Sequence, residues 1–475
     1  MSGFASWLFN AAGVAVAVTV VIAALSQLTL VVSAVVELAH MRSRDRHRLW
    51  RRILGSQMAP RVTVLVPAHN EAVTIADSVA GVLALAYPNL EVVVVDDGST
   101  DGTLDELITT FGLVAVHPIY RRHLETAEVE AIYRSSSEPD LIVVRKRNGG
   151  KADALNCALD VASGELVCAI DADTLVTHDC LQQMVTPFFG DEGIVAVGGT
   201  VRLVNEAVVT SGVVARVTAP RRLLAGVQAV EYTRAFLVGR LGWNRLGGNL
   251  LISGAFGLFR RDRLLDIGGY EANTVGEDME LIVRLRRHAV DNGREAKVHF
   301  VPDPIAWTEA PESLRVLSRQ RNRWHRGLCD VLVRHRRMIF NRRYGMAGTL
   351  GMPYYLVVEA LAPVVEFVGL VLLGIGLWTG QVGPSVLAIV ALAHLLAMAV
   401  TLAVLWVDDV GFRSYPGVLS RLRLVGYVVV DQLIYRPMTL AWRLWGLKMF
   451  LEGRGEWGDM TRKGLGAKDR DPQLV

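Results

Sequence analysis

Long apolar stretches without charge constrain the fold of this chain more than any other feature. Residues 1–36 contain no charged side chain, and neither do residues 367–407. The apolar run over residues 11–36 is long enough to cross the hydrocarbon core of a bilayer, which is about 30 Å thick. The sequence therefore predicts an integral membrane protein whose soluble part lies between membrane-spanning segments.

The residues that follow the first apolar run indicate its orientation. Six arginines lie within residues 42–52, and positive residues beside a membrane-spanning helix mark its cytoplasmic side. A secretory signal peptide would instead have a positive start, a shorter apolar run and a small-residue cleavage site. We therefore expect residues 1–40 to be an uncleaved anchor with its N-terminus outside, followed by a basic cytoplasmic linker over residues 41–59.

A second apolar block extends from residue 345 to residue 407, and Glu359 and Glu366 are its only charged residues. The turn-forming sequence TGQVGP at residues 379–384 divides it into two predicted spanning helices, at residues 353–378 and 385–407.

Residues 424–450 form a third apolar stretch, but four charged side chains interrupt it. It therefore either crosses the bilayer within a bundle or lies along the cytoplasmic interface. We expect a juxtamembrane or interface helix at residues 331–352, membrane and interface helices at residues 353–450, and a polar tail at residues 451–475.

Composition excludes several classes of protein. The chain has 475 residues, and its 50 Lys and Arg nearly balance its 47 Asp and Glu. A nucleic-acid-binding protein usually has a strong basic excess, so we expect no nucleic-acid partner. The four cysteines have neither CxxC spacing nor nearby histidine pairs, which predicts buried, reduced thiols rather than zinc ligands or disulfides.

The segment from about residue 60 to residue 310 is predicted to be soluble and to alternate strands with helices. Short β-branched runs ending in polar residues predict strands at residues 62–68, 90–97, 141–146, 165–171 and 193–199. Helical stretches lie between them, such as residues 71–85 and 151–163. This pattern predicts an α/β domain with a largely parallel sheet covered by helices. Ligands bind at the carboxyl ends of parallel strands, so the polar strand ends are the candidate site.

Two acidic motifs follow predicted strands. VDDGSTDGT at residues 95–103 carries carboxylates that can accept hydrogen bonds from a ribose or a base, or can equally form a turn and cap the next helix. Asp171 and Asp173 end the fourth strand. Two carboxylates at this spacing can bind one divalent cation together with diphosphate oxygens, although ordinary acidic turns have the same pattern.

Three further segments carry polar chemistry. NGGK at residues 148–151 opens a predicted helix; either Lys151 and the helix N-terminus bind an anion, or the segment is an ordinary loop-to-helix junction. Asp278 begins another predicted helix, and it either complements the helix dipole or acts as a general base. QRNRW at residues 320–324 can bind diphosphate and stack on a sugar, or can contact anionic lipid as a basic juxtamembrane segment. Neither GxGxxG after the first strand nor GxxxxGK[ST] occurs, which argues against dinucleotide and P-loop sites.

The order of the motifs decides between these alternatives. Along the chain they are VPAHNE, VDDGSTDGT, NGGKADALN, DAD, SGAFG, GED and QRNRW. Together they closely resemble the family 2 glycosyltransferases, in particular the membrane-embedded processive branch that includes cellulose, chitin, hyaluronan and poly-N-acetylglucosamine synthases. The resemblance covers residues 60–330 and implies a cytoplasmic catalytic domain of the GT-A (Rossmann-like) fold, flanked by transmembrane helices.

The resemblance also implies roles for the residues that match the family motifs. A nucleotide-sugar donor, expected to be UDP-linked, would be held by Pro67, Glu71, Asp96, Asp97, Lys151, Asp171 and Arg323. Mg²⁺ or Mn²⁺ would be bound by Asp171 and Asp173, with Asp173 the more direct ligand. Asp278, with Glu277 beside it, would be the catalytic base that takes a proton from the acceptor hydroxyl and so inverts the anomeric centre. The acceptor would be bound by Ser253, Gly254, Phe256, Gln320 and Trp324.

The product is left open by the sequence. Glu359 and Glu366 are seven residues apart and share a helix face, so they either line a channel for an exported polysaccharide or bond neighbouring helices. The acceptor is a growing β-linked polysaccharide or, alternatively, a membrane lipid. An inactive transport or assembly subunit is disfavoured because the predicted catalytic residues are intact. A homo-oligomer or an export partner would complete a pore, and the bacterial plasma membrane is the expected location.

Overall fold

The computed structural model describes residues 3–43, 54, 56, 58–118, 120–172, 174–205, 208–210, 213–380 and 382–453. Their contacts divide them into two compact units. The sheet unit comprises residues 40–218 and 251–310, and the helical unit comprises residues 3–39, 219–250 and 311–453, as far as these are described. The sequence predicts an uninterrupted catalytic domain over residues 60–330, whereas residues 219–250 and 311–330 pack with the helical unit.

The sheet unit contains the strands that the apolar runs predict, together with several that they do not. Its main sheet is formed by β1 (Val62–Ala68), β2 (Leu90–Asp97), β3 (Leu113–Val116), β4 (Val129–Ser135), β5 (Leu141–Lys146), β6 (Leu166–Ile170), β7 (Leu175–Val176), β8 (Ile194–Leu203), β11 (Phe256–Arg260) and β12 (Lys297–Thr308). A separate two-stranded sheet pairs β9 (Val208–Thr210) with β10 (Val213–Arg216). All five predicted strands are confirmed to within a few residues.

Among the described residues the strand order is β3-β4-β5-β2-β1-β6-β11-β8-β12-β7. The central strands β5, β2, β1 and β6 are parallel, so their carboxyl ends meet at one edge. The prediction of a largely parallel sheet is wrong in its extent, because β11 runs antiparallel between β6 and β8, and β3, β4 and β7 also pair antiparallel. Part of the SGAFG motif forms this β11 strand, which sequence periodicity does not reveal.

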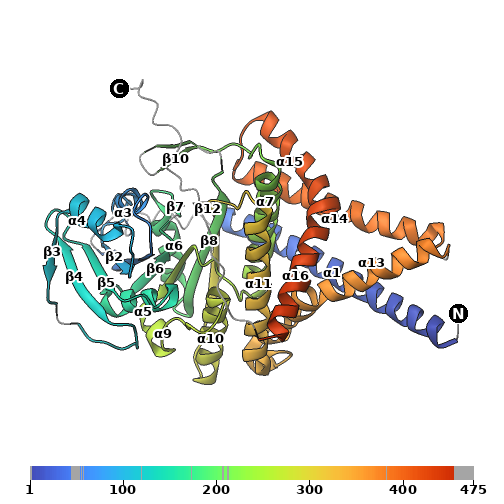
Figure 1. The fold of residues 1–475 in the computed structure, drawn as a ribbon, viewed down its shortest axis with the longest axis horizontal. Helices are drawn as coiled ribbons and strands as arrows, with labels where there is room; N and C mark the ends of the chain where they lie inside the picture. Colours follow the sequence, from blue (N-terminus) through green and yellow to red (C-terminus); the bar gives the residue numbers. More distant parts are fainter. Residues whose placement is uncertain are drawn as a thin grey trace. The chain divides into compact units, whose positions relative to one another are not determined.

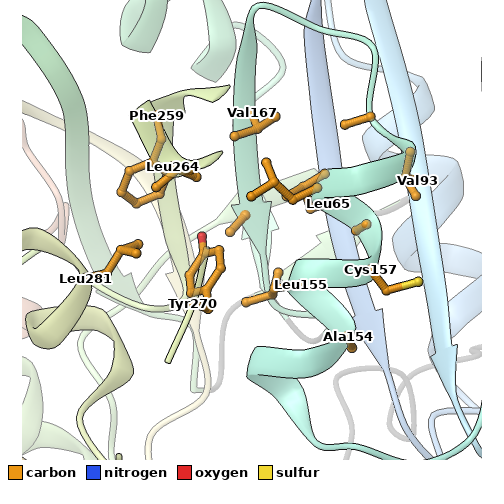
Figure 2. Packing of buried hydrophobic residues seen from close by; sticks show 14 of the residues in the cluster. Leu65, Val93, Ala154, Leu155, Cys157, Val167, Phe259, Leu264, Tyr270 and Leu281 are labelled. Carbon is orange, nitrogen blue, oxygen red and sulfur yellow. The ribbon is translucent and has the colours of Figure 1, made fainter. Parts of the chain in front are cut away.

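Helices cover the sheet and enclose its core (Figure 1). They are α3 (Ile75–Leu83), α4 (Thr103–Phe111), α5 (Lys151–Val161), α6 (Cys180–Gly190), α9 (Arg261–Asp266) and α10 (Glu277–Asp291). Figure 2 shows one cluster of buried side chains, in which Leu155 of α5, Leu264 of α9 and Leu281 of α10 pack with strand residues such as Leu65 and Val93. Residues two apart in a strand point to the same face of the sheet. Most strand residues of this cluster alternate in this way, so α5, α9 and α10 cover the same face of the sheet.

The helical unit contains the helices expected to span a membrane. Its helices are α1 (Gly3–Ser43), α7 (Leu223–Arg234), α8 (Leu241–Leu246), α11 (Leu314–Arg334), α12 (Met352–Tyr354), α13 (Ala362–Trp378), α14 (Pro384–Gly411), α15 (Val418–Val430) and α16 (Arg436–Leu451). Shorter π-helical and 3₁₀ stretches at Ala235–Arg240, Arg336–Met338, Arg342–Tyr344, Ala347–Gly351, Tyr355–Leu361 and Asp431–Tyr435 connect several of them. Three segments in the described part are long and apolar enough to cross a bilayer, namely Gly13–Met41, Ala347–Trp378 and Pro384–Gly411. These match the three predicted spans.

The third apolar stretch is helical throughout, from α15 through the π-helical stretch to α16, and is not among those three segments. It packs closely on α11, where a Cβ on Gly446 would lie 2.8 Å from the carbonyl oxygen of Asn322. The predicted interface helix at residues 331–352 is instead broken, since α11 ends at Arg334 and short 3₁₀ and π-helical turns follow. The predicted polar tail begins at residue 451, and residues 454–475 lie outside the described residues.

The buried strands predict a matched pair of stability variants. Val144 of β5 is fully buried in the same hydrophobic cluster, whereas Val114 of β3, in the same sheet, is 60% exposed. Val144→Ala removes buried methyl groups and leaves a cavity, so we expect the free energy of unfolding to fall by roughly 2–3 kcal/mol. Val114→Ala should change it by less than about 0.5 kcal/mol. Denaturant unfolding of the purified protein measures both, and equal effects would contradict this account of the core.

Candidate functional site

Asp97, at the carboxyl end of β2, organises the loop that opens α5. Its carboxylate accepts hydrogen bonds from the backbone N–H groups of Gly149 (2.9 Å) and Gly150 (2.7 Å). Its carbonyl oxygen accepts another from the Asn148 side chain at 2.9 Å. Gly150 has φ +87°, a conformation that favours glycine. The NGG segment is therefore held against the end of β2, and α5 begins directly after it.

Lys146, at the end of β5, neutralises this arrangement from inside the protein. The side chain is fully buried, and its Nζ lies 2.5 Å from a carboxylate oxygen of Asp97 and 2.5 Å from one of Asp153 on α5. Burial alone lowers the pKa of Lys146, but hydrogen bonds to Asp153 and Asp97 raise it overall. One ammonium group thus ties β5, β2 and α5 together.

The loop after β1 packs on the loop after β2, as the predicted donor site requires. The backbone N–H of Asn70 donates to Ser99 Oγ (3.0 Å), and that of Glu71 donates to Thr103 Oγ1 (2.9 Å). Pro67 is the sixth residue of β1 and pairs with Val95 of β2. Asp96 is fully buried, and its carboxylate accepts from the backbone N–H of Ser99 at 3.0 Å. The sheet unit therefore brings Pro67, Glu71, Asp96 and Asp97 to one edge.

A second group of predicted residues meets at the end of β6. Lys151 Nζ lies 2.5 Å from a carboxylate oxygen of Asp171 and donates to the carbonyl oxygen of Gly254 at 3.2 Å. A Cβ built on Gly254 would lie 3.5 Å from Cβ of Asp278 and 3.7 Å from Lys151 Nζ. Residues far apart in the sequence, from four motifs, thus form one charged cluster that we call the carboxylate–lysine cluster: Lys151, Asp171, Gly254 and Asp278.

The electrostatics of Lys151 reflect these neighbours. Burial lowers the pKa of Lys151, but the negative charges of Asp171, Glu277 and Asp278 raise it overall. The group therefore stays protonated at neutral pH, with acidic side chains on both sides. A cation held in this way can stabilise negative charge on a ligand phosphate.

The two helices that carry the cluster are fixed to one another. Asn156 of α5 exchanges two hydrogen bonds with the backbone of Tyr270, at 2.9 and 2.6 Å. Arg284 of α10 donates to the carbonyl oxygens of Ile267 and Gly269, each at 2.6 Å, and pairs with Glu280 at 2.9 Å. The loop before α10 is thus held from both sides, which sets the position of Asp278 in the first helical turn relative to Lys151.

The remaining predicted residues of the sheet unit lie near the cluster in the sequence but differ in exposure. Ser253 accepts the backbone N–H of Ala255 on its hydroxyl oxygen at 3.4 Å. Phe256 is fully buried on β11, paired with Ile170 of β6. Phe256 can therefore shape the site only from behind. Glu277 and Asp278 are half-buried, and the Asp278 carboxylate accepts its neighbour's N–H, that of Met279, at 2.8 Å.

The predicted metal site consists of Asp171 and Asp173. Asp173 lies outside the described residues, and among those that the structure describes no group of three His, Cys, Asp or Glu side chains could hold a metal ion. The carboxylate of Asp171 is of the hard-oxygen type that Mg²⁺ and Mn²⁺ prefer. The described part of the site therefore offers the type of ligand atom that a divalent cation of this class binds.

The cysteines take no part in such a site. Cys157, Cys168, Cys180 and Cys329 are all buried free thiols, as predicted. Burial raises the pKa of Cys157 to about 12 and that of Cys329 to about 11. Thiols of this kind are protonated and unreactive at neutral pH.

The QRNRW motif belongs to the helical unit, on α11. Trp324 is 45% exposed, with the Arg321 guanidinium 4.1 Å from its ring centroid. Arg321 is buried, pairs with Glu231 at 2.6 Å and donates to the Tyr435 hydroxyl at 3.1 Å. Arg323 and Gln320 are half-buried, and Gln320 Oε1 has no hydrogen-bond partner among the described residues. The motif thus presents Trp324 outward from a helix that Arg321 anchors.

Several residues that position the site are not apparent from the sequence. Lys146 and Asp153 brace Asp97, and Asn156 and Arg284 fix the start of α10. The sequence has one signal of the role of Lys146: it lies two and four residues after Val144 and Ile142 in β5, so all three side chains are on the same inward face. A lysine at a core position requires an acidic partner, but the sequence does not say which one.

Known proteins resemble this chain over the same region. A family model described as "Glycosyltransferase like family 2" matches residues 60–327, more than half of the chain. The poly-beta-1,6-N-acetyl-D-glucosamine synthase of Staphylococcus aureus (strain COL) is 30% identical over 276 residues, which cover 58% of this chain and 56% of the synthase. The enzyme of the same name from Staphylococcus epidermidis is 28% identical over 279 residues, covering 58% and 57%. This chain thus matches little more than half the length of these relatives.

The solved structures similar to this chain include a glycosyl-transferring enzyme of an archaeon. It is a mannosyltransferase from Pyrobaculum calidifontis in complex with GDP-Man and Mn²⁺, with a TM-score of 0.49 and 19% sequence identity. The match covers 90% of this chain and 99% of that one.

The buried ammonium group predicts a strong and pH-dependent effect on stability. Lys146→Met leaves the buried carboxylate of Asp97 and the half-buried carboxylate of Asp153 without their cation, so we expect the free energy of unfolding to fall by roughly 3–5 kcal/mol. Because the pKa of Lys146 is raised in the folded protein, its contribution is complete below the ordinary lysine value of about 10.4 and is lost as pH rises through the folded value. Denaturant unfolding at several pH values measures the difference.

A matched control lies in the same sheet. Lys297 of β12 also contacts two carboxylates, Asp191 and Glu295, each at 2.9 Å, but its side chain is 50% exposed. Lys297→Met should lower the free energy of unfolding by less than about 1 kcal/mol because water screens the pair. If both variants lost the same stability, the buried link would not have the role assigned to it.

Proposed function

Because the chain belongs to glycosyltransferase-like family 2, we propose that it is a membrane-bound enzyme that transfers a sugar from a nucleotide sugar to a growing β-linked polysaccharide. The carboxylate–lysine cluster carries this proposal, since Lys151, Asp171 and Asp278 converge at the carboxyl edge of the parallel strands. Ligands bind at such edges in α/β sheets. Transfer of a sugar from a diphosphate donor to a hydroxyl requires a cation near the diphosphate and a base near the hydroxyl, and this cluster has both an ammonium group and carboxylates.

The donor would lie along the edge formed by β1, β2 and β5. Pro67, Glu71, Asp96 and Asp97 would bound the nucleoside, and Lys151 would face the diphosphate. Asp97 already accepts two backbone hydrogen bonds from the NGG segment. Part of its contribution to nucleoside binding would therefore be to hold that segment in place. Arg323 is proposed to contact the departing diphosphate.

A divalent cation, Mg²⁺ or Mn²⁺, is proposed to be held by Asp171 and Asp173, where it would neutralise charge on the diphosphate. Asp171 lies 2.5 Å from the Lys151 ammonium. Lys151 would therefore stay near the diphosphate in the donor complex, and its raised pKa keeps it protonated there. Release of the cation should weaken donor binding, because Lys151 would be the main remaining positive charge of the cluster.

Asp278 is proposed as the catalytic base. Its carboxylate would take the proton of the acceptor hydroxyl as that oxygen attacks the anomeric carbon from the side opposite the diphosphate. The attack would invert the anomeric configuration, giving a β-linkage from an α-linked donor. Gly254 would allow the acceptor close to the base, since a side chain there would approach Asp278. Glu277 would contribute negative charge, and Ser253, Gln320 and Trp324 would bind the acceptor.

The substrate and the location are also proposals. Because the curated relatives are named poly-beta-1,6-N-acetyl-D-glucosamine synthases, UDP-linked N-acetylglucosamine is the first donor to test. The arginines after the first span support a cytoplasmic catalytic domain under the positive-inside rule, and nucleotide sugars are cytoplasmic metabolites. A bacterial plasma membrane, with export of the product, fits this arrangement.

The test uses the full chain in nanodiscs with a panel of radiolabelled UDP- and GDP-sugars, with and without Mg²⁺ or Mn²⁺. We expect one donor to give a polydisperse, water-soluble polymer and EDTA to abolish its formation. Label that partitions into organic solvent, at one or two sugars per molecule, would instead indicate a lipid acceptor. Absence of transfer from every donor, with donor binding also absent, would contradict the proposed activity.

The assigned base predicts a separation of binding from turnover. Asp278→Asn keeps the shape of the side chain but cannot take a proton, so we expect turnover to fall by about 10²–10⁴-fold with donor affinity nearly unchanged. Turnover is measured by sugar incorporation and affinity by calorimetric titration of the donor. Asp266→Asn is the matched control, because Asp266 is exposed and forms a surface pair with Arg294. Wild-type turnover in Asp278→Asn would remove Asp278 from its role.

A further inference from the structure

A sharply turned segment between α11 and the second apolar span exposes both arginine and apolar side chains. We call residues 335–346 the arginine turn. It contains the 3₁₀ stretches Arg336–Met338 and Arg342–Tyr344, and the apolar segment Ala347–Trp378 begins directly after it. The whole turn belongs to the helical unit.

The conformation of the arginine turn is fixed by a buried side chain and by hydrogen bonds within the turn. Met338 is fully buried beneath it. The Asn341 side chain bonds the turn on both sides, donating to the Arg337 carbonyl and accepting from the Arg343 N–H, each at 3.0 Å. The first turn of the next segment packs tightly against it, since a Cβ on Gly348 would lie 2.8 Å from the Met338 carbonyl oxygen. The exposed side chains are therefore presented by an ordered scaffold.

Phe340 stands at the tip of this scaffold in an unfavourable conformation. Its φ is +58°, in the left-handed region that bulky residues rarely adopt. The side chain is nevertheless 67% exposed, so burial inside the protein does not compensate the strain. Strained backbone retained at an exposed aromatic residue points to a role outside the fold.

The surroundings of Phe340 have a consistent chemistry. Other apolar side chains at or beside the turn are also exposed, namely Val333 (53%), Met346 (40%) and Leu350 (47%). Arg336, Arg337, Arg342 and Arg343 are exposed between them. The sequence has no Asp or Glu from residue 331 to residue 358, so this stretch is strongly basic.

We propose that the arginine turn is a docking surface for an anionic lipid bilayer, with Phe340 inserted among the acyl chains and the four arginines on lipid phosphates. Apolar side chains interleaved with arginines are the chemistry of interfacial membrane anchors. Continuity favours a bilayer over a protein partner, because the turn leads without a break into a segment apolar enough to span the membrane. The surface would hold the start of that segment at the lipid headgroups. This inference does not depend on the proposed catalytic function.

The buried cysteines make a direct depth measurement feasible. Since all four native thiols are buried, the full chain with Phe340→Cys can be labelled at that position with a spin label. Power-saturation electron paramagnetic resonance in nanodiscs of phosphatidylcholine and phosphatidylglycerol then compares access of oxygen, which concentrates in lipid, with that of a water-soluble nickel chelate. Ile389→Cys, within Pro384–Gly411, is the lipid-exposed reference, and Val114→Cys on β3 is the aqueous one.

We expect the label at residue 340 to have oxygen access close to that at residue 389 and little access to the nickel chelate. Access equal to that at residue 114, in nanodiscs with and without phosphatidylglycerol, would overturn the proposal. Protection from both reagents would also overturn it, because it would indicate burial against protein.

Two sets of variants separate charge from apolar insertion. With the label at residue 340, phosphatidylglycerol should place the label deeper. Replacing all four arginines by glutamine should remove this difference, whereas replacing them by lysine should keep it. Phe340→Gly relieves the backbone strain, so the purified protein in detergent should be at least as stable as the wild type. With a label at Leu350→Cys instead, Phe340→Gly should give a shallower position than the wild-type turn. An unchanged depth there would overturn the anchoring role of Phe340.

Discussion

The fully buried ammonium group of Lys146 is the interaction on which the site of the sheet unit depends. An unpaired charge in a protein interior is strongly destabilising, so Lys146 requires an acidic partner. It has two, Asp97 and Asp153, each at 2.5 Å. These two carboxylates come from β2 and α5, and their pairing fixes where α5 starts. Because Lys151 is the first residue of α5, the same ion cluster sets the position of the cation that faces Asp171. A contact within the core thus determines the geometry at the surface.

Close backbone approach supports this arrangement. A Cβ on Gly98 would lie 2.8 Å from the backbone nitrogen of Asn148, and one on Gly149 would collide with the carboxylate of Asp153. Glycine is required at Gly98 because the loops after β2 and β5 lie directly against each other, and at Gly149 because the Asp153 side chain of α5 occupies the space that a Cβ would need. Packing therefore explains both glycines, independently of any ligand.

Charged residues in the helical unit bond its helices to one another. Arg443 of α16 donates to the carbonyl oxygen and the carboxylate of Glu359, and the Tyr354 hydroxyl donates to the same carboxylate at 3.2 Å. Asp431 is buried and pairs with Arg234 of α7 at 2.8 Å. Of the two roles that the sequence left open for Glu359, bonding between helices therefore has direct structural support. These pairs also explain how residues 424–450 carry charge among apolar side chains.

The sequence by itself determined the parts that depend on local chemistry. Apolar length predicted the three spans, β-branched runs predicted the strands β1, β2, β5, β6 and β8, and the motif order predicted the family and the residues that converge at the sheet edge. The mixed direction of the sheet was missed, because β11 is short and its pairing partners β6 and β8 lie far away in the sequence.

Only the tertiary structure decided which charges meet. Lys146 could be recognised as a lysine on an inward face, but its partners Asp97 and Asp153 and the links through Asn156 and Arg284 are set by packing between distant segments. Likewise, the composition of residues 331–352 predicted an interface helix, whereas the structure has a turn that exposes Phe340 at φ +58°. Residue types and their periodicity can be read along the chain. Which side chains contact one another depends on how helices and strands pack, and the site consists of such contacts.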